Sequence, residues 1–448
     1  MAAFEDYRSA IAYIFQQLPM YQRTGMLPAK LDLSRTQAML AALDQPERGL
    51  SIVHVGGTNG KGTVSHILAS FANAAGLKVG LYTSPHYVDY RERIRVNGQC
   101  IDEAYVHAFV EAHHVQIQRL GLSFFELTCC MGLAYFRDRE VDLVVLEVGL
   151  GGRLDSTNVV TPLLSVITNV DLDHTDVLGS TRAQIAAEKA GIVKAGVPLL
   201  VGRRQAETAA VFERFTDELR SELHYAQELV HVERVNGSFL TRGRDMWSSF
   251  RLPHRGMAVR GPFAEENLRT AFAAWQLLSE WASHLNLCRL PYEALYRMSA
   301  LSGYGGRFQS FDTQPRILAD AGHNDAAWSR VMPALGTLAA GGSLYVVAGF
   351  VKGKDPRDFV RYLRESATLI VCDVDVPRNR PRAETIVDLN DLCRARGHRL
   401  LDGGTLSEGL QLALRLTAPE DLVFVGGSSY VVGELLPQIQ ELTFRSPA

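Results

Sequence analysis

A glycine-rich segment with one lysine, GGTNGKGT at 56–63, lies between an apolar run and a helical pattern. The apolar run at 52–55 predicts a buried strand, and apolar residues at helical spacing from 64 to 71 predict a helix. Glycines let backbone N–H groups approach phosphate oxygens, and a helix start adds favourable partial charge. Lys61 would reach the β- and γ-phosphates of a nucleotide, and Thr63 would lie near their metal ion. The segment predicts a triphosphate site; the alternative is a turn with a surface lysine.

The spacing in this segment differs from the common P-loop pattern at two positions. That pattern places glycine where this chain has Val55, and Ser or Thr directly after the lysine, where this chain has Gly62. If the segment holds phosphates, it is a variant of the common P-loop.

Polar residues also follow other predicted strands. Ser84 follows one strand, Glu147 lies at the end of the strand 141–148, and His174 follows the strand 163–169. Ligands of open α/β sheets bind at the carboxyl ends of the strands. Oxygen ligands there suit a hard cation, and a buried lone glutamate would need a metal or a basic partner. In the same acidic loop Asp171 and Asp176 are equally well explained as helix-capping residues, and His174 is the better ligand candidate.

A second group of polar residues follows strands in the last third of the chain. Asp320 and His323 follow the strand 317–320, and Ser428 follows the strand 421–425. His323 is either a titratable group available for proton transfer or a capping residue at the strand end, and the two alternatives are equal. Asn267 lies in the first turn of a predicted helix and is most simply a helix-start residue.

The elements that must position these residues alternate between strand and helix. The run VDLVVLEV at 141–148 is apolar almost throughout, as in a parallel strand buried on both faces. Segments of alternating polarity on either side of Asn236-Gly237 predict a small antiparallel piece between 223 and 257. Beyond 312–315, strand and helix alternate again, which predicts a second, smaller α/β unit.

We therefore expect an α/β protein of two domains. Residues 1–312 would form an ATP-binding domain with a parallel sheet, the phosphate loop and the small antiparallel portion. Residues 313–448 would form a smaller Rossmann-like α/β domain. The loop 19–31, which contains PMYQRTGMLPAK, is either a plain connector or a segment that contacts substrate.

The composition excludes several classes of protein. A chain of 448 residues with 47% hydrophobic and 21% charged residues is expected to form a soluble protein of two or three domains. The formal net charge of −3, without a long basic run, argues against nucleic acid as the main partner. We expect no secretory signal and no membrane span. The six cysteines are scattered, as in a cytoplasmic protein with reduced thiols, and we expect a monomer.

Seven blocks carry a family resemblance. GTNGKGT, TSPHYVDYRERIRVNG, LEVGLGGRLDSTNVV, DLDHTDVLG, EKAGI, GGRF and DAGHN occur in this order. The first resembles the ATP loop of the Mur ligase superfamily. Together they resemble folylpolyglutamate synthase and its bifunctional bacterial form, dihydrofolate synthase. One departure is Asp325, which follows DAGHN where the family usually has proline.

The resemblance implies roles for particular residues. The implied ATP contacts are Gly57, Thr58, Asn59, Gly60, Lys61, Gly62, Thr63, Asn267, Arg307 and Asp320. The implied metal ligands are Ser84, Glu147 and His174. The implied substrate contacts are Phe124 or Phe125, Leu154, Asp155, Ser156, His323 and Ser428. The implied catalytic residues are Lys61, Lys189 and His323, and Lys189 matches a lysine that is carbamylated in family members.

The resemblance also implies a reaction. ATP, with Mg²⁺ or Mn²⁺, would activate a carboxylate of dihydropteroate or of a folate as an acyl phosphate, and L-glutamate would then form the amide. The sequence leaves open whether the first glutamate, later glutamates or both are added. Two alternatives remain: a Mur-type ligase acting on a peptidoglycan precursor, and an ATPase without ligation. Only about 50 residues precede the phosphate loop, which leaves little room for a uridine-nucleotide domain.

Overall fold

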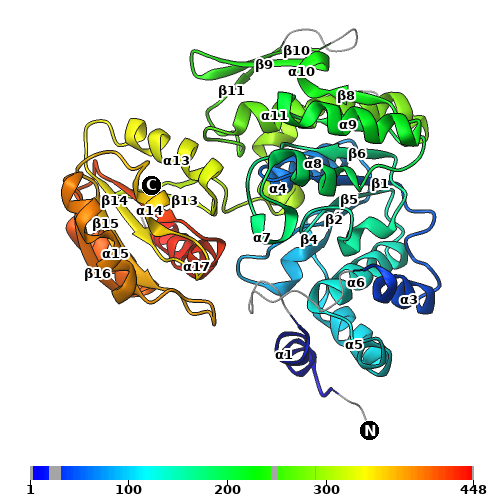
Figure 1. Cartoon of the computed structure of the whole chain (residues 1–448), viewed down its shortest axis with the longest axis horizontal. Helices are drawn as coiled ribbons and strands as arrows, with labels where there is room; N and C mark the ends of the chain where they lie inside the picture. Colours follow the sequence, from blue (N-terminus) through cyan, green and yellow to red (C-terminus); the bar gives the residue numbers. More distant parts are fainter. Residues whose placement is uncertain (1–3, 20–31, 244–249, 288, 446–448) are drawn as a thin grey trace. The chain divides into compact units, whose positions relative to one another are not determined.

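The computed structural model describes residues 4–19, 32–243, 250–287 and 289–445, so most of the loop 19–31 lies outside the described residues. The chain forms two compact units (Figure 1). The first comprises Met1–Pro85, Arg91–Ala258 and Ala264–Tyr304, and the second comprises His86–Tyr90, Val259–Phe263 and Gly305–Ala448.

The first unit is built on a largely parallel sheet. Within the described residues it has eight strands in the order β4-β3-β2-β5-β1-β6-β7-β8. Strands β2, β5, β1, β6, β7 and β8 run parallel, and β3 and β4 add antiparallel pairs at one edge. Their bounds are β1 Ile52–Gly56, β2 Val79–Tyr82, β3 Ile94–Val96, β4 Gln99–Cys100, β5 Leu143–Glu147, β6 Leu164–Ile167, β7 Leu199–Val201 and β8 Leu223–Tyr225.

The register of this sheet brings the chemically important strand ends together. Val55 of β1 pairs with Glu147 of β5, and Gly56 of β1 pairs with Ile167 of β6. On the other side of β5, Tyr82 pairs with Leu146. The residues that follow β1, β2, β5 and β6 therefore lie together at the carboxyl ends of the parallel strands, as predicted from the sequence.

Helices cover both faces of this sheet. Helices α4 and α11 pack on one face, and α6, α8 and α9 pack on the other. The helices are α1 Tyr7–Gln17, α3 Ser34–Ala42, α4 Lys61–Ala74, α5 Glu103–Leu120, α6 Phe124–Asp138, α7 Thr175–Leu178, α8 Arg182–Ala190, α9 Ala206–Leu219, α10 Ala226–Leu229, α11 Ala264–Trp281 and α12 Met298–Ser302. The sequence pattern predicts a helix over 183–194, whereas α8 ends at Ala190, with Gly191 as its C-cap.

The antiparallel piece expected between 223 and 257 is present but begins later, at Val230, because Leu223–Tyr225 form β8, which pairs in parallel with β7. It is a three-stranded sheet in the order β11-β10-β9, with β9 Val230–Val235, β10 Ser238–Gly243 and β11 Phe250–Pro253. Asn236 and Gly237 have φ angles of 47° and 71°, as a tight hairpin turn requires.

The second unit has its own sheet, in the order β12-β13-β17-β14-β15-β16. The strands are β12 Gln309–Phe311, β13 Arg316–Asp320, β14 Leu344–Ala348, β15 Thr368–Asp373, β16 Arg399–Thr405 and β17 Leu422–Gly426. The sequence patterns did not predict strand β16. The C-terminal segment of this unit begins at Gly305, whereas the sequence placed the domain boundary at 313; β12 pairs with β13 and so belongs to this sheet.

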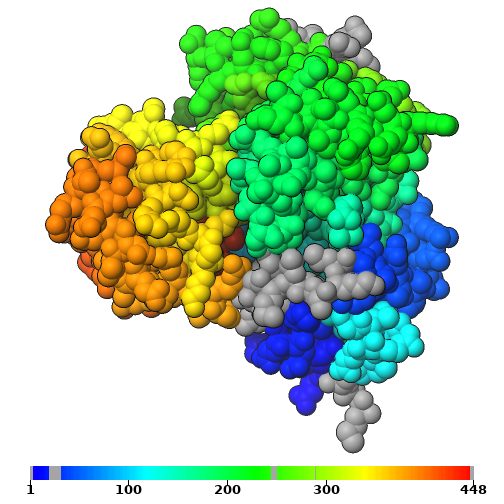
Figure 2. All heavy atoms as spheres, viewed as in Figure 1, coloured from blue at the N-terminus to red at the C-terminus, as the bar shows by residue number. Residues whose placement is uncertain are grey.

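Alternate residues of these strands face two hydrophobic cores. Leu318, Val346 and Phe424 face α13, α14 and α15, whereas Ile317, Val347 and Val423 face α16 and α17. The helices are α13 Asp325–Leu338, α14 Pro356–Val360, α15 Arg382–Ala395, α16 Leu406–Leu416 and α17 Ser429–Arg445. In the space-filling view, the visible surface of this unit comes mostly from the yellow-to-orange part of the chain, which includes α13 to α15 (Figure 2).

Two further observations concern the described residues. None of their helices is long and apolar enough to span a bilayer. The five described cysteines are all free thiols.

Candidate functional site

The glycine-rich loop connects β1 to α4, as the sequence predicted. Gly57 and Gly60 have φ angles of 137° and 83°, which side-chain-bearing residues rarely adopt, and α4 begins directly after Gly60. The lysine of the loop folds back over it: Lys61 Nζ donates hydrogen bonds to the carbonyl oxygens of Gly57, at 3.1 Å, and Thr58, at 3.2 Å. Its ammonium group therefore lies across the loop that would hold the phosphates.

Two glycines of the loop lie against predicted site residues. A Cβ atom added to Gly60 would lie 2.3 Å from Oδ1 of Asn267, which is buried in the first turn of α11. A Cβ atom added to Gly62 would lie 3.5 Å from Oε1 of Glu147. The fold thus brings Asn267 and Glu147 to the junction between the loop and α4.

Glu147, the last residue of β5, and Ser84, which follows β2, lie side by side at the ends of their strands. Glu147 is 2% exposed, and its Oε2 accepts a hydrogen bond from the backbone N–H of Ser84 at 2.9 Å. The hydroxyl of Thr63 is also buried, 3.4 Å from the hydroxyl of Tyr304. A buried carboxylate and hydroxyl groups beside a phosphate loop fit a hard divalent cation such as Mg²⁺.

Lys189 reaches the same loop from α8. Its side chain is 3% exposed, and Nζ donates a hydrogen bond to the carbonyl oxygen of Gly57 at 2.9 Å. Burial, with the charge of Lys61 as a smaller cause, lowers the pKa of Lys189 from 10.5 to about 7, against the opposing charges of Asp173 and Asp155. A substantial fraction of the Lys189 amine is therefore neutral near pH 7.

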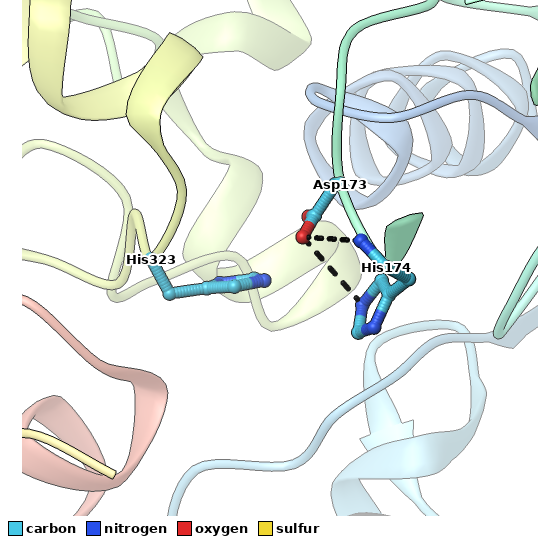
Figure 3. A group of neighbouring side chains, drawn as sticks. All are labelled: Asp173, His174 and His323. Atoms are coloured by element: carbon cyan, nitrogen blue, oxygen red, sulfur yellow. Dashed lines mark hydrogen bonds and ion pairs between the residues drawn. The ribbon is translucent and has the colours of Figure 1, made fainter. Parts of the chain in front are cut away.

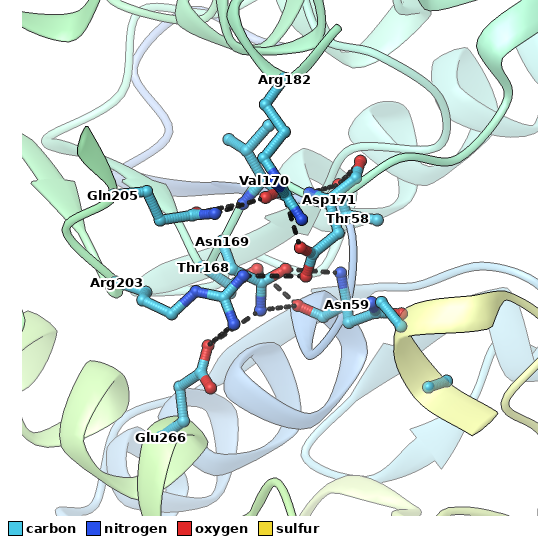
Figure 4. A network of polar contacts seen from close by, with 12 residues as sticks. Thr58, Asn59, Thr168, Asn169, Val170, Asp171, Arg182, Arg203, Gln205 and Glu266 are labelled. Atoms are coloured by element: carbon cyan, nitrogen blue, oxygen red, sulfur yellow. Dashed lines mark hydrogen bonds and ion pairs between the residues drawn. The ribbon is translucent and has the colours of Figure 1, made fainter. Parts of the chain in front are cut away.

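The segment that follows β6 forms several hydrogen bonds with the phosphate loop through Asn169 and Asp171 (Figure 4). The backbone N–H of Asn59 donates to Oδ1 of Asn169 at 3.0 Å, and Nδ2 of Asn169 donates to the carbonyl oxygen of Asn59 at 3.1 Å. The hydroxyl of Thr58 donates to the carbonyl oxygen of Asp171 at 3.2 Å and accepts from its N–H at 3.0 Å. Sequence reasoning missed Asn169 as a functional residue, although its place after a strand adjacent to β1 is a signal that could have found it.

His174 lies in this segment at the start of α7, in the left-handed conformation with φ of 47°. Figure 3 shows it beside Asp173, whose Oδ1 accepts a hydrogen bond from the backbone N–H of His174 at 2.9 Å. The ring Nε2 of His174 lies 4.0 Å from the same oxygen. An imidazole next to a carboxylate is a suitable cation ligand, which supports the predicted metal role of His174. That role remains a prediction.

Asp155, expected to contact substrate, holds its own loop together. The carboxylate is 6% exposed and accepts hydrogen bonds from the N–H of Leu150 at 2.8 Å and from the hydroxyl and N–H of Thr157 at 2.6 and 3.0 Å. Burial raises the pKa of Asp155, and these hydrogen bonds oppose the rise. Buried Ser156 accepts a contact from Sγ of Cys129 through its carbonyl oxygen, and the side chain of Leu154 is half-buried.

The two phenylalanines offered as alternatives differ in environment. Phe124 is 2% exposed and packs against Phe15, at 5.5 Å between ring centroids, and under the guanidinium of Arg93. Phe125 is half-buried, and its ring lies where a Cβ atom on Gly149 would meet it at 2.4 Å. Phe125 is therefore the better placed of the two to meet a ligand at the 149–155 loop.

In the second unit, Asp320 is the last residue of β13, and its carboxylate connects the backbone at Phe308 to the turn at Gly322. Its oxygens accept hydrogen bonds from the N–H groups of Phe308 and Gly322, each at 2.8 Å. Burial raises the pKa of Asp320, while the charge of Arg307 and the two hydrogen bonds lower it. The Arg307 guanidinium lies over the ring of Tyr87, 5.9 Å from its centroid.

His323 and Ser428 follow neighbouring strands, since Asp320 of β13 pairs with Gly426 of β17. Nδ1 of His323 lies 3.2 Å from the carbonyl oxygen of Ala321, which fixes Nδ1 as the protonated nitrogen of the neutral ring. The hydroxyl of Ser428 accepts a hydrogen bond from the N–H of Tyr430 at 3.2 Å. Asp325 accepts hydrogen bonds from Arg361 and Tyr362 at the start of α13.

Two domain families match this chain. The Mur ligase middle domain matches residues 55–201, and the glutamate ligase domain of Mur ligases matches residues 306–429. The first match includes the phosphate loop, Ser84, Glu147, His174 and Lys189. The second includes Arg307, Asp320, His323 and Ser428.

Curated relatives match over most of this chain. The folylpolyglutamate synthase of Lacticaseibacillus casei is 30% identical, with 95% of this chain and 97% of that protein covered. The dihydrofolate synthase/folylpolyglutamate synthase of Escherichia coli is 31% identical, with 91% of each covered. A probable bifunctional folylpolyglutamate synthase/dihydropteroate synthase of Haloferax volcanii is 32% identical, and this chain spans only half of its length.

Solved structures agree with these relatives. Escherichia coli FolC in complex with DHPP and ADP matches with a TM-score of 0.81 at 27% identity, covering 100% of both chains. The bifunctional enzyme of Yersinia pestis in complex with AMPPNP and Mn ion matches with a TM-score of 0.78 at 28% identity, covering 98% of this chain and 99% of that one. The chain belongs to the folylpolyglutamate synthase/dihydrofolate synthase family of the Mur ligase superfamily, and it is an enzyme that forms carbon–nitrogen bonds.

Proposed function

We propose that this chain adds L-glutamate, with consumption of ATP, to dihydropteroate, to the glutamate tail of a folate, or to both. The observation that carries this proposal is the convergence of Lys61, Lys189 and Glu147 on the phosphate loop. The acceptors are taken from relatives named dihydrofolate synthase and folylpolyglutamate synthase, and from FolC, whose structure contains DHPP and ADP.

The first step is transfer of the γ-phosphoryl group to a carboxylate of the acceptor. A carboxylate oxygen forms a bond to phosphorus as the bond from phosphorus to the β,γ-bridging oxygen breaks, which gives an acyl phosphate and ADP. Lys61 exchanges its contacts with the carbonyl oxygens of Gly57 and Thr58 for phosphate oxygens. The N–H groups at the start of α4 hold the same oxygens and offset the charge that develops there.

Glu147, Ser84 and His174 would hold the divalent cation that accompanies the nucleotide. When bound, the ion neutralises phosphate charge. A histidine among oxygen ligands is compatible with Mn²⁺ as well as Mg²⁺. The structure of the Yersinia pestis enzyme contains AMPPNP and Mn ion, and another solved structure of a bifunctional folylpolyglutamate synthase/dihydrofolate synthase contains Mn, AMPPNP and L-glutamate.

Lys189 is proposed to be carbamylated. Carbamylation requires a neutral amine, and the lowered pKa of Lys189 supplies it near pH 7. The modified group would carry a negative charge and would be a further oxygen ligand near the cation. Carbon-13 NMR of the protein equilibrated with labelled bicarbonate should show a carbamate signal that is absent from Lys189→Arg.

The second step is attack of the glutamate amine on the acyl carbon, after which phosphate leaves. The amine must lose a proton, and His323 is the proposed acceptor. Because Nδ1 of His323 faces the carbonyl oxygen of Ala321, the lone pair of the neutral ring is on Nε2. If His323 has this role, His323→Gln should lower kcat more than it raises the KM for ATP; a capping role would lower stability instead.

The decisive experiment is ADP release by purified protein with ATP, Mg²⁺ and L-glutamate, with dihydropteroate and tetrahydrofolate in separate reactions. We expect each accepted substrate to gain the mass of one glutamate. Turnover with both acceptors would establish the bifunctional enzyme, and turnover with one would establish that activity alone. ADP release without any acceptor would favour a plain ATPase, and ligation to a nucleotide-linked peptidoglycan precursor would favour a cell-wall ligase.

We also propose a cytoplasmic location and a monomeric state. The free thiols of the described cysteines are consistent with a reducing compartment. Size-exclusion chromatography with light scattering would test the monomer, and a dimer mass would reject it.

A further inference from the structure

Asp171 and Glu266 are two nearly buried acidic residues that are linked to the phosphate loop by hydrogen bonds. The side chains of Asp171 and Glu266 are each 11% exposed. Asp171 binds Thr58 through its backbone N–H and carbonyl groups, and Glu266 accepts a hydrogen bond at 3.2 Å from Nδ2 of Asn169, which in turn binds Asn59. The backbone of Asp171 and, through Asn169, the carboxylate of Glu266 therefore support Thr58 and Asn59, the two residues of the loop that precede Gly60.

The position of these acids creates an electrostatic conflict. The loop must attract a polyphosphate of several negative charges, and buried carboxylates nearby repel it, because water screens poorly there. Buried charges are also unfavourable unless they are paired. The supporting role of Asp171 and Glu266 therefore requires a cation close to both.

Arg203 supplies that cation (Figure 4). It follows β7, and its Nη2 donates a hydrogen bond to Oδ2 of Asp171 at 2.9 Å, while its Nη1 lies 4.0 Å from Oε1 of Glu266. Arg182 also pairs with Asp171, at 3.6 Å, but it is shared with Glu207 at 3.1 Å, and its side chain is 40% exposed, against 32% for Arg203. Arg203 is the arginine that bridges the two carboxylates.

We propose that Arg203 is a positioning residue for ATP, acting through Asp171 and Glu266 on Thr58 and Asn59. By neutralising both acids, it lets them hold the loop in its binding conformation without repelling the phosphates. This inference rests on the proposed use of the loop as the ATP site. The adjacent Arg204 provides a matched control, because it pairs with Glu228 at 3.0 Å and lies over the ring of Tyr225.

The experiment compares Arg203→Met, Arg203→Lys and Arg204→Met by calorimetric titration with ADP and Mg²⁺, together with the KM values for ATP and glutamate. Arg203→Met should raise the Kd for ADP and the KM for ATP by about tenfold, the size of one lost charge pairing in a mostly buried site. The KM for glutamate should stay unchanged, Arg203→Lys should recover part of the loss, and Arg204→Met should bind ADP as the unmodified protein does.

A second variant separates charge from folding. In Asp171→Asn/Arg203→Met both charges of the pair are absent, so ADP affinity should recover relative to Arg203→Met alone. A double variant no better than the single one, or an Arg203→Met protein with unchanged Kd for ADP, would overturn the proposal. If the unmodified protein binds ADP but ligates glutamate to neither acceptor, the proposed function fails while the Arg203 comparison remains valid.

Discussion

Lys189 is a residue whose chemistry is set by its surroundings rather than by its type. Its pKa is about 7 in the folded chain, against 10.5 in water. Below pH 7 the amine is protonated in both states, and the folded state bears the full penalty of the buried charge. Between pH 7 and 10.5 only the unfolded chain holds the proton, so stability rises with pH across this window.

This argument gives a prediction for Lys189→Met. The unmodified protein, in buffer free of carbon dioxide, should gain roughly 2 kcal/mol of unfolding free energy relative to the variant between about pH 6.5 and pH 9. Urea unfolding at a series of pH values measures the difference. A difference that does not change with pH would show that the Lys189 amine is protonated throughout.

Gly60 shows how one position restricts the phosphate loop. Gly60→Ala would combine a left-handed φ of 83° with a Cβ atom 2.3 Å from Asn267. We expect the loop to shift and ADP affinity to fall by about tenfold or more. Gly76→Ala is the control: its φ is 93° and a Cβ atom there meets nothing within 4 Å, so it should cost about 1 kcal/mol of stability without affecting ADP binding. Equal loss of ADP binding in both variants would contradict the prediction.

At the scale of elements, helix α8 carries Lys189 and depends on its first turn. The hydroxyl of Thr181 accepts a hydrogen bond from the N–H of Gln184 at 3.2 Å, and Oε1 of Gln184 accepts from the N–H of Thr181 at 3.1 Å. This reciprocal cap satisfies N–H groups that the helix leaves without partners.

Thr181→Ala should therefore destabilise the protein by about 1 kcal/mol, and Thr181→Ser should retain most of the stability. Chemical denaturation measures both. If alanine and serine variants are equally stable, the cap contributes nothing measurable, and the position of α8 must be fixed by the burial of Ile185 and Ala186 instead.

Elements with strong patterns were predictable, and weakly patterned ones were not. The strand at 141–148 was predicted because an almost continuous apolar run is typical of a parallel strand that is buried on both faces. Strand β5 is indeed central in its sheet and buried. Strand β16 was missed because its residues Arg399, Asp402 and Gly403-Gly404 are not those of a buried strand. It lies at the edge of its sheet, where one side has no neighbouring strand.

At the scale of the whole molecule, the second unit includes a segment from a distant part of the sequence. Arg330 of α13 donates a hydrogen bond to the carbonyl oxygen of Pro262 at 2.7 Å and lies over the ring of Phe263, 4.2 Å from its centroid. These contacts hold the segment Val259–Phe263 against α13, which lies in the C-terminal segment of the same unit.

Arg330→Met should lower the unfolding free energy of this unit by about 1–2 kcal/mol, through loss of the hydrogen bond and the cation–π contact. Arg357→Met is the control, because Arg357 is exposed and pairs with Asp355, two residues away. It should leave the unfolding midpoint unchanged. If both variants unfold at the midpoint of the unmodified protein, the contact of Arg330 with Pro262 and Phe263 does not hold the segment in place.

The sequence by itself determined the α/β class, the phosphate loop and the family. These depend on local patterns: an apolar strand, glycines where the backbone must approach phosphate, and polar residues at strand ends. It also indicated Lys189 and Glu147 as site residues through their motifs, although their roles in the reaction remain predictions.

Only the tertiary structure decided which side chains meet. Arg203 follows β7 and Glu266 lies on α11, and their proximity to Asp171 results from the order of strands and from the packing of α11 on the sheet. The pKa of Lys189 likewise depends on burial and on Lys61, 128 positions away in the chain. The proximity of Arg203 and Glu266 to Asp171 and the pKa of Lys189 both result from contacts between residues far apart in the sequence. A local pattern of residues therefore cannot predict them.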